Sequence, residues 1–226
     1  MLNAVILAGG LGTRLQQTVP DLPKTLAPIR GKAFLDILLD YIEESHVIDR
    51  VILSVGHQKE KILHHLKKHP RTIEVLFSSE NYPLGTGGAI SKAVEAVHSS
   101  SFFVFNGDTL AHLSLKDMME RFSSSSMLAA IYKKNTKHSG WLKINEAGWI
   151  TSFEEKRQDN PSGWINAGVY LFKKKHFEKP LPEVFSLETF FLPQLLQEGI
   201  QSFCFDGLFI DIGTKDSYEQ AQTLDL

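Results

Sequence analysis

Cysteine is almost absent from this sequence of 226 residues. The single cysteine, Cys204, excludes a disulfide bond within the chain and any zinc site built from several cysteines. A reducing cytoplasm is the simplest setting for such a chain. The first residues also lack the basic region and the cleavable apolar segment of a secretion signal. We therefore expect a cytoplasmic protein.

An excess of charge of one sign and long apolar runs are also missing. The 24 lysines and arginines nearly balance the 26 acidic residues, which leaves a net charge of -2. Such a chain has no bulk attraction to nucleic acid or to an anionic membrane surface. No apolar run approaches the roughly 20 residues needed to cross a bilayer. Nucleic acids and membranes are therefore not expected partners.

The first half of the chain alternates between strand-like and helical patterns. This alternation is typical of a parallel sheet covered by helices on both faces. We therefore predict an α/β fold, and we find no tandem repeat or linker that would divide it. The strand-like runs are residues 4–8, 51–55, 73–77 and 102–105, and the helical patterns are residues 34–45, 57–69 and 90–97.

Consecutive strand-like runs dominate the second half, which suggests antiparallel hairpins attached to the parallel sheet. Asp206-Gly207 separates two apolar runs and predicts a hairpin between them. Pro193 is expected to kink or split a helix over residues 186–197. The strand-like runs are residues 127–132, 141–145, 149–153 and 164–172, and a last helix is expected over residues 215–224.

A glycine-rich segment, GGLGTR at residues 9–14, follows the first strand-like run, and Lys24 comes shortly after it. Glycine N–H groups can converge on an anion, and Arg14 and Lys24 add positive charge. The spacing fits neither a P-loop nor a dinucleotide fingerprint, because no lysine follows Gly12 directly and Leu15 replaces the third glycine. Two interpretations remain, a loop that binds nucleotide phosphates or an ordinary turn with surface charges.

A second glycine cluster, LGTGG at residues 84–88, lies between a strand-like run and a helical pattern. Glycines at a helix entry allow a flat ligand to approach the backbone closely. A flexible turn is the alternative. Two glycine loops in one sheet favour a nucleotide site made of both.

Two aspartates stand where strand-like runs end. Asp108 follows the apolar run at residues 102–105, and the ends of such strands form the ligand crevice of open α/β sheets. By itself Asp108 could equally cap a turn, but beside two glycine loops a Mg²⁺ ligand is favoured. Asp211 has a similar position, and its alternative role as a helix cap could be taken by Thr214.

Polar residues also interrupt the strands of the second half. Asn166 and Gly168 lie within an apolar run, which indicates a bulge or the close approach of a ligand. Glu155 and Lys156 stand at a strand end, where a surface ion pair is the alternative to a binding role.

Taken in order, these motifs resemble the sugar-1-phosphate nucleotidyltransferase family over essentially the whole chain. The resemblance implies one Rossmann-like domain over residues 1–226, a three-layer sandwich with a mixed, mainly parallel central sheet and an antiparallel sugar-binding extension. Nucleotide binding would fall to residues 1–112 and sugar binding to residues 113–226. The motifs are LAGGLGTRL with Pro23-Lys24, LGTGG, Gly107-Asp108, Glu155-Lys156, Asn166-Ala167-Gly168 and DIGT at residues 211–214.

The resemblance also implies the reaction, in which an NTP and a sugar 1-phosphate give an NDP-sugar and pyrophosphate with the help of Mg²⁺. Asp108 and Asp211 would bind the metal, and with Arg14 and Lys24 they would be the catalytic residues. The residues implied for the nucleotide are Leu7, Ala8, Gly9, Gly10, Gly12, Thr13, Arg14, Gly85, Thr86 and Gly88. Those implied for the sugar phosphate are Lys24, Glu155, Lys156, Asn166 and Gly168.

Within the family, the LGTGGAI and IDIGT motifs and the short length look most similar to bacterial guanylyltransferases of D-glycero-α-D-manno-heptose 1-phosphate. This implies GTP as the nucleotide and GDP-heptose for surface polysaccharide as the product. Uridylyltransferases of N-acetylmuramate 1-phosphate and guanylyltransferases of mannose 1-phosphate are alternatives. A non-catalytic sensor of NDP-sugars is an alternative of another class, although all four implied catalytic residues are present. The oligomeric state stays open.

Overall fold

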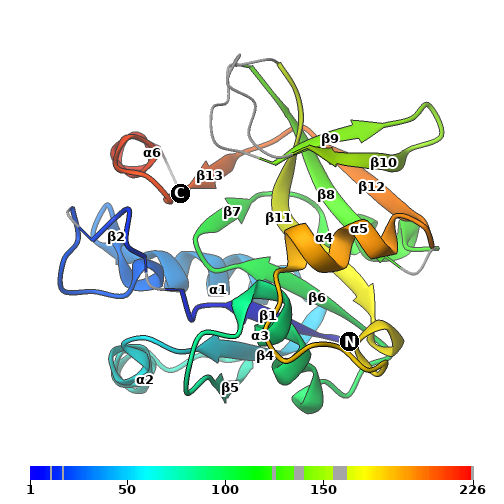
Figure 1. The fold of residues 1–226 in the computed structure, drawn as a ribbon. Helices are drawn as coiled ribbons and strands as arrows, with labels where there is room; N and C mark the ends of the chain where they lie inside the picture. Colours follow the sequence, from blue (N-terminus) through cyan, green and yellow to red (C-terminus); the bar gives the residue numbers. More distant parts are fainter. Residues whose placement is uncertain (11, 17, 124–125, 135–139, 155–161, 225–226) are drawn as a thin grey trace.

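The computed structural model describes residues 1–10, 12–16, 18–123, 126–134, 140–154 and 162–224. A nine-stranded sheet in the order β5-β4-β1-β6-β11-β8-β12-β10-β9 runs through the molecule (Figure 1). Its strands are β1 (Leu2–Leu7), β4 (Ile48–Val55), β5 (Glu74–Ser79), β6 (Ser101–Asn106), β8 (Ser126–Lys133), β9 (Trp141–Ile144), β10 (Trp149–Glu154), β11 (Gly163–Lys173) and β12 (Ile200–Phe205).

The other elements are shorter. Two small sheets pair β2 (Pro28–Ile29) with β3 (Lys32–Ala33) and β7 (Thr109–Ala111) with β13 (Phe209–Asp211). The α-helices are α1 (Phe34–Glu44), α2 (Lys59–Lys68), α3 (Gly85–Ala93), α4 (Leu115–Arg121), α5 (Leu192–Leu195) and α6 (Lys215–Ala221). A π-helix, Leu187–Phe191, precedes α5, and short 3-10 helices occupy Lys24–Leu26, Val94–Ala96 and Lys174–Phe177. None of the helices in these ranges is long and apolar enough to cross a membrane.

Strand direction follows the predicted pattern. β5, β4, β1 and β6 pair in parallel, and so do β8 and β12. In the described part of the sheet, only β11 and β10 run against the other strands. The prediction of a mixed, mainly parallel sheet is therefore confirmed.

Side chains of the central strands alternate between two apolar cores. In β1, Ala4 and Ile6 belong to one core and Val5 belongs to the other. Helices α1, α2, α4 and α6 pack in the first core, while α3 and α5 pack in the second. Burial on both faces explains why the β1 and β6 runs are apolar throughout. The result is the expected three-layer sandwich.

Strand β11 joins the two halves of the sheet. Its last residues, from Val169 to Lys173, pair with β6, whereas Trp164 and Ile165 pair with β9. The register with β8 shifts between Asn166 and Tyr170, so the predicted bulge at residues 166–168 is confirmed. Strands β11, β8, β12, β10 and β9 consequently form a closed ring of pairings.

The predicted hairpin at Asp206-Gly207 is wrong. β12 pairs with β8 and β10 in the large sheet, while β13 pairs with β7 in a separate one. After Gly207 the chain runs beside the segment after β7, and the N–H of His112 donates to the carbonyl of Leu208 at 2.9 Å. Pairing with distant strands thus overrides the local turn signal, which describes only the loop itself.

Two helices differ from their predicted limits. Pro193 does split the segment 186–197, and it lies in the first turn of α5, where a missing N–H is tolerated. Helix α3 begins at Gly85 instead of Ile90, because the N–H groups of Gly87 and Gly88 donate to the carbonyl of Phe185 at 3.0 and 3.2 Å. This contact satisfies helix N–H groups that would otherwise lack partners.

The ends of β1 and β6 approach each other very closely. The N–H of Gly107, directly after β6, donates to the carbonyl of Leu7 at 3.0 Å. A Cβ atom at Gly107 would lie 2.3 Å from that carbonyl oxygen and 2.9 Å from Cγ2 of Thr25. Only glycine fits there, and it sets the position of the next residue, Asp108.

We therefore expect Gly107→Ala to lower the free energy of unfolding by about 1–3 kcal/mol, because the added methyl group forces the two strand ends apart. Urea unfolding of the variant and the wild type measures this change. Gly10→Ala is the matched control, since nothing lies within 4 Å of a Cβ at Gly10. Equal losses of stability in the two variants would contradict the argument.

Candidate active site

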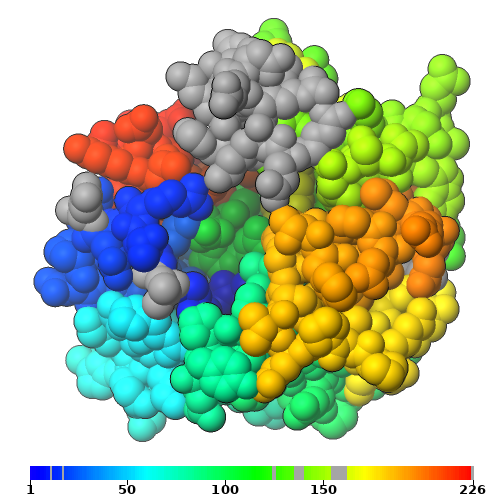
Figure 2. Space-filling view, viewed as in Figure 1, coloured from blue at the N-terminus to red at the C-terminus, as the bar shows by residue number. Residues whose placement is uncertain are grey.

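A cleft of about 410 Å³ opens at the carboxyl ends of β1 and β6. Its size is typical of a site for a small ligand. In Figure 2 it is the hollow at the centre of the molecule, with the blue N-terminal segment on one side and the orange segment containing α5 on the other. Parallel strands deliver their loops to this edge, as the sequence predicted.

Most of the first glycine segment lines the cleft. The lining residues are Leu7, Ala8, Gly10, Gly12, Thr13 and Arg14. Gly9 faces away from it, because a Cβ there would lie 2.9 Å from Oε1 of Glu80 and 3.3 Å from the backbone nitrogen of Gly56. The segment therefore brings backbone and one guanidinium group to the cleft, while Gly9 allows it to pack on the neighbouring strand ends.

Asp108 and Asp211 lie side by side, although they are far apart in the sequence. Asp211 pairs with Thr109 across the β7–β13 sheet, and the N–H of Ile212 donates to the carbonyl of Asp108 at 3.0 Å. The N-cap of α6 is Thr214, whose hydroxyl accepts from the N–H of Ser217. The alternative role of Asp211 as that cap is thus excluded.

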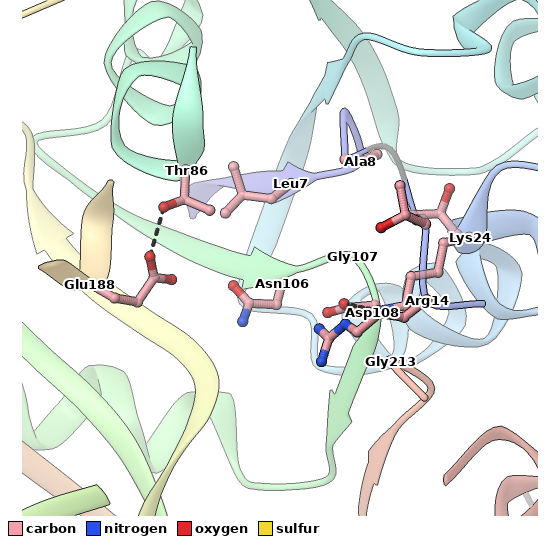
Figure 3. A pocket seen from close by; sticks show the side chains of 14 residues that line it. Leu7, Ala8, Arg14, Lys24, Thr86, Asn106, Gly107, Asp108, Glu188 and Gly213 are labelled. Atoms are coloured by element: carbon pink, nitrogen blue, oxygen red, sulfur yellow. Dashed lines mark hydrogen bonds and ion pairs between the residues drawn. The ribbon is translucent and has the colours of Figure 1, made fainter. Parts of the chain in front are cut away.

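Lys24 and Arg14 supply positive charge beside this pair. The ammonium group of Lys24 forms an ion pair with Asp108, and Figure 3 shows Arg14 next to the same carboxylate. Lys24 is held by the short 3-10 helix Lys24–Leu26, whose first residue follows Pro23. Both cations and Asp108 therefore occupy one end of the cleft.

The surroundings of Asp211 disfavour its charge. Desolvation of its carboxyl group by the surrounding protein is the main cause that raises its pKa, and the negative charge of Asp108 raises it further. The charges of Lys24 and Arg14 and the N–H of Gly213 act in the opposite direction. Two repelling carboxylates are a suitable donor set for a divalent cation. Within the described residues they have no third acidic, histidine or cysteine partner that would complete a metal cage.

The second glycine cluster contributes one side chain to the cleft, that of Thr86. Gly85 and Gly88 do not line it. A Cβ at Gly85 would lie 2.5 Å from the carbonyl oxygen of Phe185, and one at Gly88 would lie 2.3 Å from that of Glu183. In the structure, these two glycines allow the segment 183–185 to pack against the start of α3.

Asn166 and Gly168 shape the cleft from behind its wall. The amide of Asn166 donates to the hydroxyl of Tyr170 at 2.7 Å, and the N–H of Gly168 donates to Oδ1 of Asn166 at 2.9 Å. Gly168 has φ of 71° and packs against Asn106, which does line the cleft. Glu155 and Lys156 lie outside the described residues.

A family model described as nucleotidyl transferase matches residues 3–226. The chain belongs to the nucleotidyl transferase family. The D-glycero-alpha-D-manno-heptose 1-phosphate guanylyltransferase of Aneurinibacillus thermoaerophilus is 39% identical over 226 residues, which cover 98% of this chain and 97% of the relative. The protein of the same name from Campylobacter jejuni is 36% identical over 219 residues, which cover 96% and 97%.

Solved structures agree with this assignment. The crystal structure of HddC from Yersinia pseudotuberculosis matches with a TM-score of 0.90 and 37% identity over 98% of both chains. The structure of that protein complexed with GMP-PN matches with a TM-score of 0.88. The family and the fold predicted from the sequence motifs are confirmed, and the chain is a nucleotidyltransferase.

Five residues that line this nucleotidyltransferase cleft were not among the predicted site residues, namely Thr25, Asn106, Gly107, Glu188 and Gly213. Gly107 and Gly213 belong to the Gly107-Asp108 and DIGT motifs. Asn106 carried a signal, because it is the polar residue that ends an apolar strand directly before Gly107-Asp108. Thr25 follows Lys24 and could have been included with it. Glu188 follows a Ser186 cap and resembles any acidic residue in a first helical turn, so no local pattern marks it.

The raised pKa of Asp211 leads to a pH prediction for the metal-free nucleotidyltransferase. The folded protein holds this proton more tightly than the unfolded chain, so stability decreases as the pH rises from 3.8 through the raised pKa. Asp211→Asn should remove this decrease and make the protein more stable at pH 7. We expect a gain of at most about 1 kcal/mol, because water reaches the cleft and screens the charges.

Denaturant unfolding between pH 4 and pH 8 in a chelating buffer measures this effect. Asp206→Asn, on the exposed turn after β12, is the control and should leave the pH profile unchanged. If Asp211→Asn were less stable than the wild type at pH 7, the surroundings of Asp211 would not disfavour its charged form.

Proposed function

We propose that this nucleotidyltransferase transfers a guanylyl group from GTP to D-glycero-α-D-manno-heptose 1-phosphate and forms GDP-heptose and pyrophosphate. One observation carries the reaction type, the placement of Arg14 and Lys24 beside the carboxylates of Asp108, which follows β6, and Asp211, which ends β13. The two full-length guanylyltransferase relatives support the choice of GTP and heptose 1-phosphate.

This reaction needs no nucleophile from the protein, which has to supply positive charge and to align the two substrates. An oxygen of the sugar phosphate attacks the α-phosphorus of GTP, the bond to the β-phosphate oxygen breaks, and pyrophosphate leaves. The protein must bring two anions together and neutralise the charge that develops. Arg14 and the N–H groups of Gly10, Gly12 and Thr13 would hold the triphosphate, and Lys24 would lie where the two phosphates meet.

Asp108 and Asp211 would hold Mg²⁺. When bound, the ion would neutralise phosphate oxygens and help to align them for in-line transfer. The pKa of Asp211 is raised by desolvation and, next, by the charge of Asp108, and the positive charge of such an ion would favour the ionised form of both carboxylates, so the two side chains fit it. Lys24 now pairs with Asp108, and the arrival of an ion and phosphates would release its ammonium group toward the phosphates.

The sugar half of the site remains part of this proposal. From the resemblance, Glu155, Asn166 and Gly168 would contact sugar hydroxyl groups, and Lys156 would hold the sugar phosphate. In the structure Asn166 and Gly168 lie behind the wall of the cleft, so a direct contact would need the sugar to reach past Asn106. Residues 1–112 would bind the nucleotide and residues 113–226 the sugar, within one domain. We further propose that the reaction occurs in the cytoplasm and serves polysaccharide biosynthesis.

The direct test is a substrate screen. Purified protein with Mg²⁺ is combined with each NTP and with the 1-phosphates of heptose, mannose and N-acetylmuramate, and pyrophosphate release is measured. We expect the highest rate with GTP and heptose 1-phosphate, and no release when EDTA replaces Mg²⁺. A preference for UTP would exclude the proposed nucleotide, and release unaffected by EDTA would exclude the proposed metal.

Removal of one metal carboxylate should slow the chemical step. We expect Asp108→Asn to lower turnover at least about tenfold, which corresponds to about 1.4 kcal/mol in the barrier. Steady-state pyrophosphate release at saturating substrates measures it, with Asp117→Asn on the exposed start of α4 as the control. A metal-dependent rate unchanged in both Asp108→Asn and Asp211→Asn would exclude the two carboxylates from catalysis.

A further inference from the structure

Glu188 occupies the end of the cleft that lies opposite Arg14 and Lys24. It belongs to the π-helix Leu187–Phe191 and faces Thr86 at the start of α3 (Figure 3). Neither the sequence motifs nor the family resemblance pointed to it. A partly exposed carboxylate on the wall of a cleft that must receive two anions requires an explanation.

Two hydroxyl groups hold one oxygen of this carboxylate. Thr86 Oγ1 and Ser186 Oγ donate to Glu188 Oε2 at 2.7 and 3.0 Å. Each hydroxyl has a single hydrogen, so both hydrogens are used. The same oxygens accept from backbone N–H groups, Thr86 Oγ1 from Leu187 and Ser186 Oγ from Glu188 and Thr189. The carboxylate is therefore fixed in orientation.

The second carboxylate oxygen of Glu188, Oε1, differs from Oε2 in its hydrogen bonding. No donor among the described residues reaches Oε1, although the side chain lines the cleft. Thr86 cannot donate to a ligand, because its hydrogen already serves Oε2. At this end of the cleft, Oε1 of Glu188 is thus a preoriented hydrogen-bond acceptor that a ligand could reach.

A second acceptor lies on the same wall. Oδ1 of Asn106 is buried and has no hydrogen-bond partner within the described residues. Its side-chain nitrogen packs against Gly168, where a Cβ atom would lie 2.8 Å from it. The cationic side chains that line the described cleft, Arg14 and Lys24, gather at the other end. Acceptors without a neighbouring cation suit neutral donor groups and repel anionic ones.

We propose that Glu188 is a specificity residue that accepts hydrogen bonds from hydroxyl groups of the sugar, with Asn106 as a second acceptor and Thr86 as the residue that positions the carboxylate. This inference rests on the proposed function. The 1-phosphate of the sugar would lie at Lys24 and Asp108, and in Figure 3 Asn106 lies between that centre and Glu188. The site would accordingly select neutral polyhydroxylated sugars and reject sugars that carry a carboxylate.

Glu188→Gln tests the assignment with the intact chain, because it keeps the shape and removes the charge. Pyrophosphate release is measured against heptose 1-phosphate at saturating GTP, and against GTP at saturating heptose 1-phosphate. We expect the KM for the sugar phosphate to rise about tenfold, as for a lost hydrogen bond to a charged group, with the KM for GTP within about twofold of the wild type. An unchanged KM for the sugar phosphate, or an equal rise for GTP, would overturn the assignment.

Two further variants separate binding from folding. Glu183→Gln is the matched control, since Glu183 accepts from Tyr82 outside the cleft, and it should change neither KM. Thr86→Val keeps the Glu188 charge but removes one of its two anchors, and it should raise the sugar KM by a smaller factor. This variant decides the question if Glu188→Gln does not fold.

Failure of the proposed function can be told apart from failure of the Glu188 assignment by the activity of the wild type. A wild type that releases no pyrophosphate from any substrate pair would refute the function. Calorimetric titration of the same sugar 1-phosphates into wild type and Glu188→Gln would then test the role of Glu188 directly. Weaker binding by the variant supports that role, whereas equal binding, or no binding to the wild type, overturns it.

Discussion

The repulsion between Asp108 and Asp211 is the constraint on which the cleft depends. The two carboxylates come from different ends of the chain, and the short β7–β13 pairing holds them together. Desolvation by the surrounding protein and the nearby charge of Asp108 raise the pKa of Asp211, so the arrangement is unfavourable unless positive charge is near. Lys24 and Arg14 supply part of that charge. Under the proposed function, this arrangement would be prepared in advance for a cation and for the phosphates that accompany it.

Close packing also limits the backbone next to Asp108. Gly107 brings β6 against the carbonyl of Leu7, and Asp108 follows immediately. On the opposite wall, the segment 183–185 packs on the glycines of α3 and so delivers Ser186 and Glu188 to Thr86. Tight packing of chain segments thus places both the cationic end and the acceptor end of the cleft.

Local patterns in the sequence predicted the features that depend on local structure. Apolar runs identified β1 and β6, because both faces of these strands are buried, and Asn166 with Gly168 marked the bulge in β11. The turn signal at Asp206-Gly207 was misleading, because the partners of β12 and β13 lie elsewhere in the chain.

Local sequence patterns also could not reveal those parts of the site that depend on contacts between distant segments. The glycine segment, Lys24 and Asp108 could be found because each follows a recognisable motif. Gly85 and Gly88 were assigned to the nucleotide, but their absent side chains make room for Phe185 and Glu183, contacts that only the folded chain reveals. Glu188 could not be found, since its place on the cleft wall depends on its hydrogen bond with Thr86, which is remote in sequence and adjacent in space.

Strand β11 connects the part of the sheet that carries the cleft to the ring of strands in the second half of the chain. One part of it pairs with β6 beside the phosphate end, and the other closes the ring that contains the β9–β10 hairpin. None of the described residues from 126 to 187 lines the cleft, and within the described structure the bulge at residues 166–168 touches its wall at Asn106. A substitution in the ring would therefore be felt at the described cleft wall through the packing of Gly168 on Asn106, while the loops that carry Arg14, Lys24 and Asp108 would keep their places.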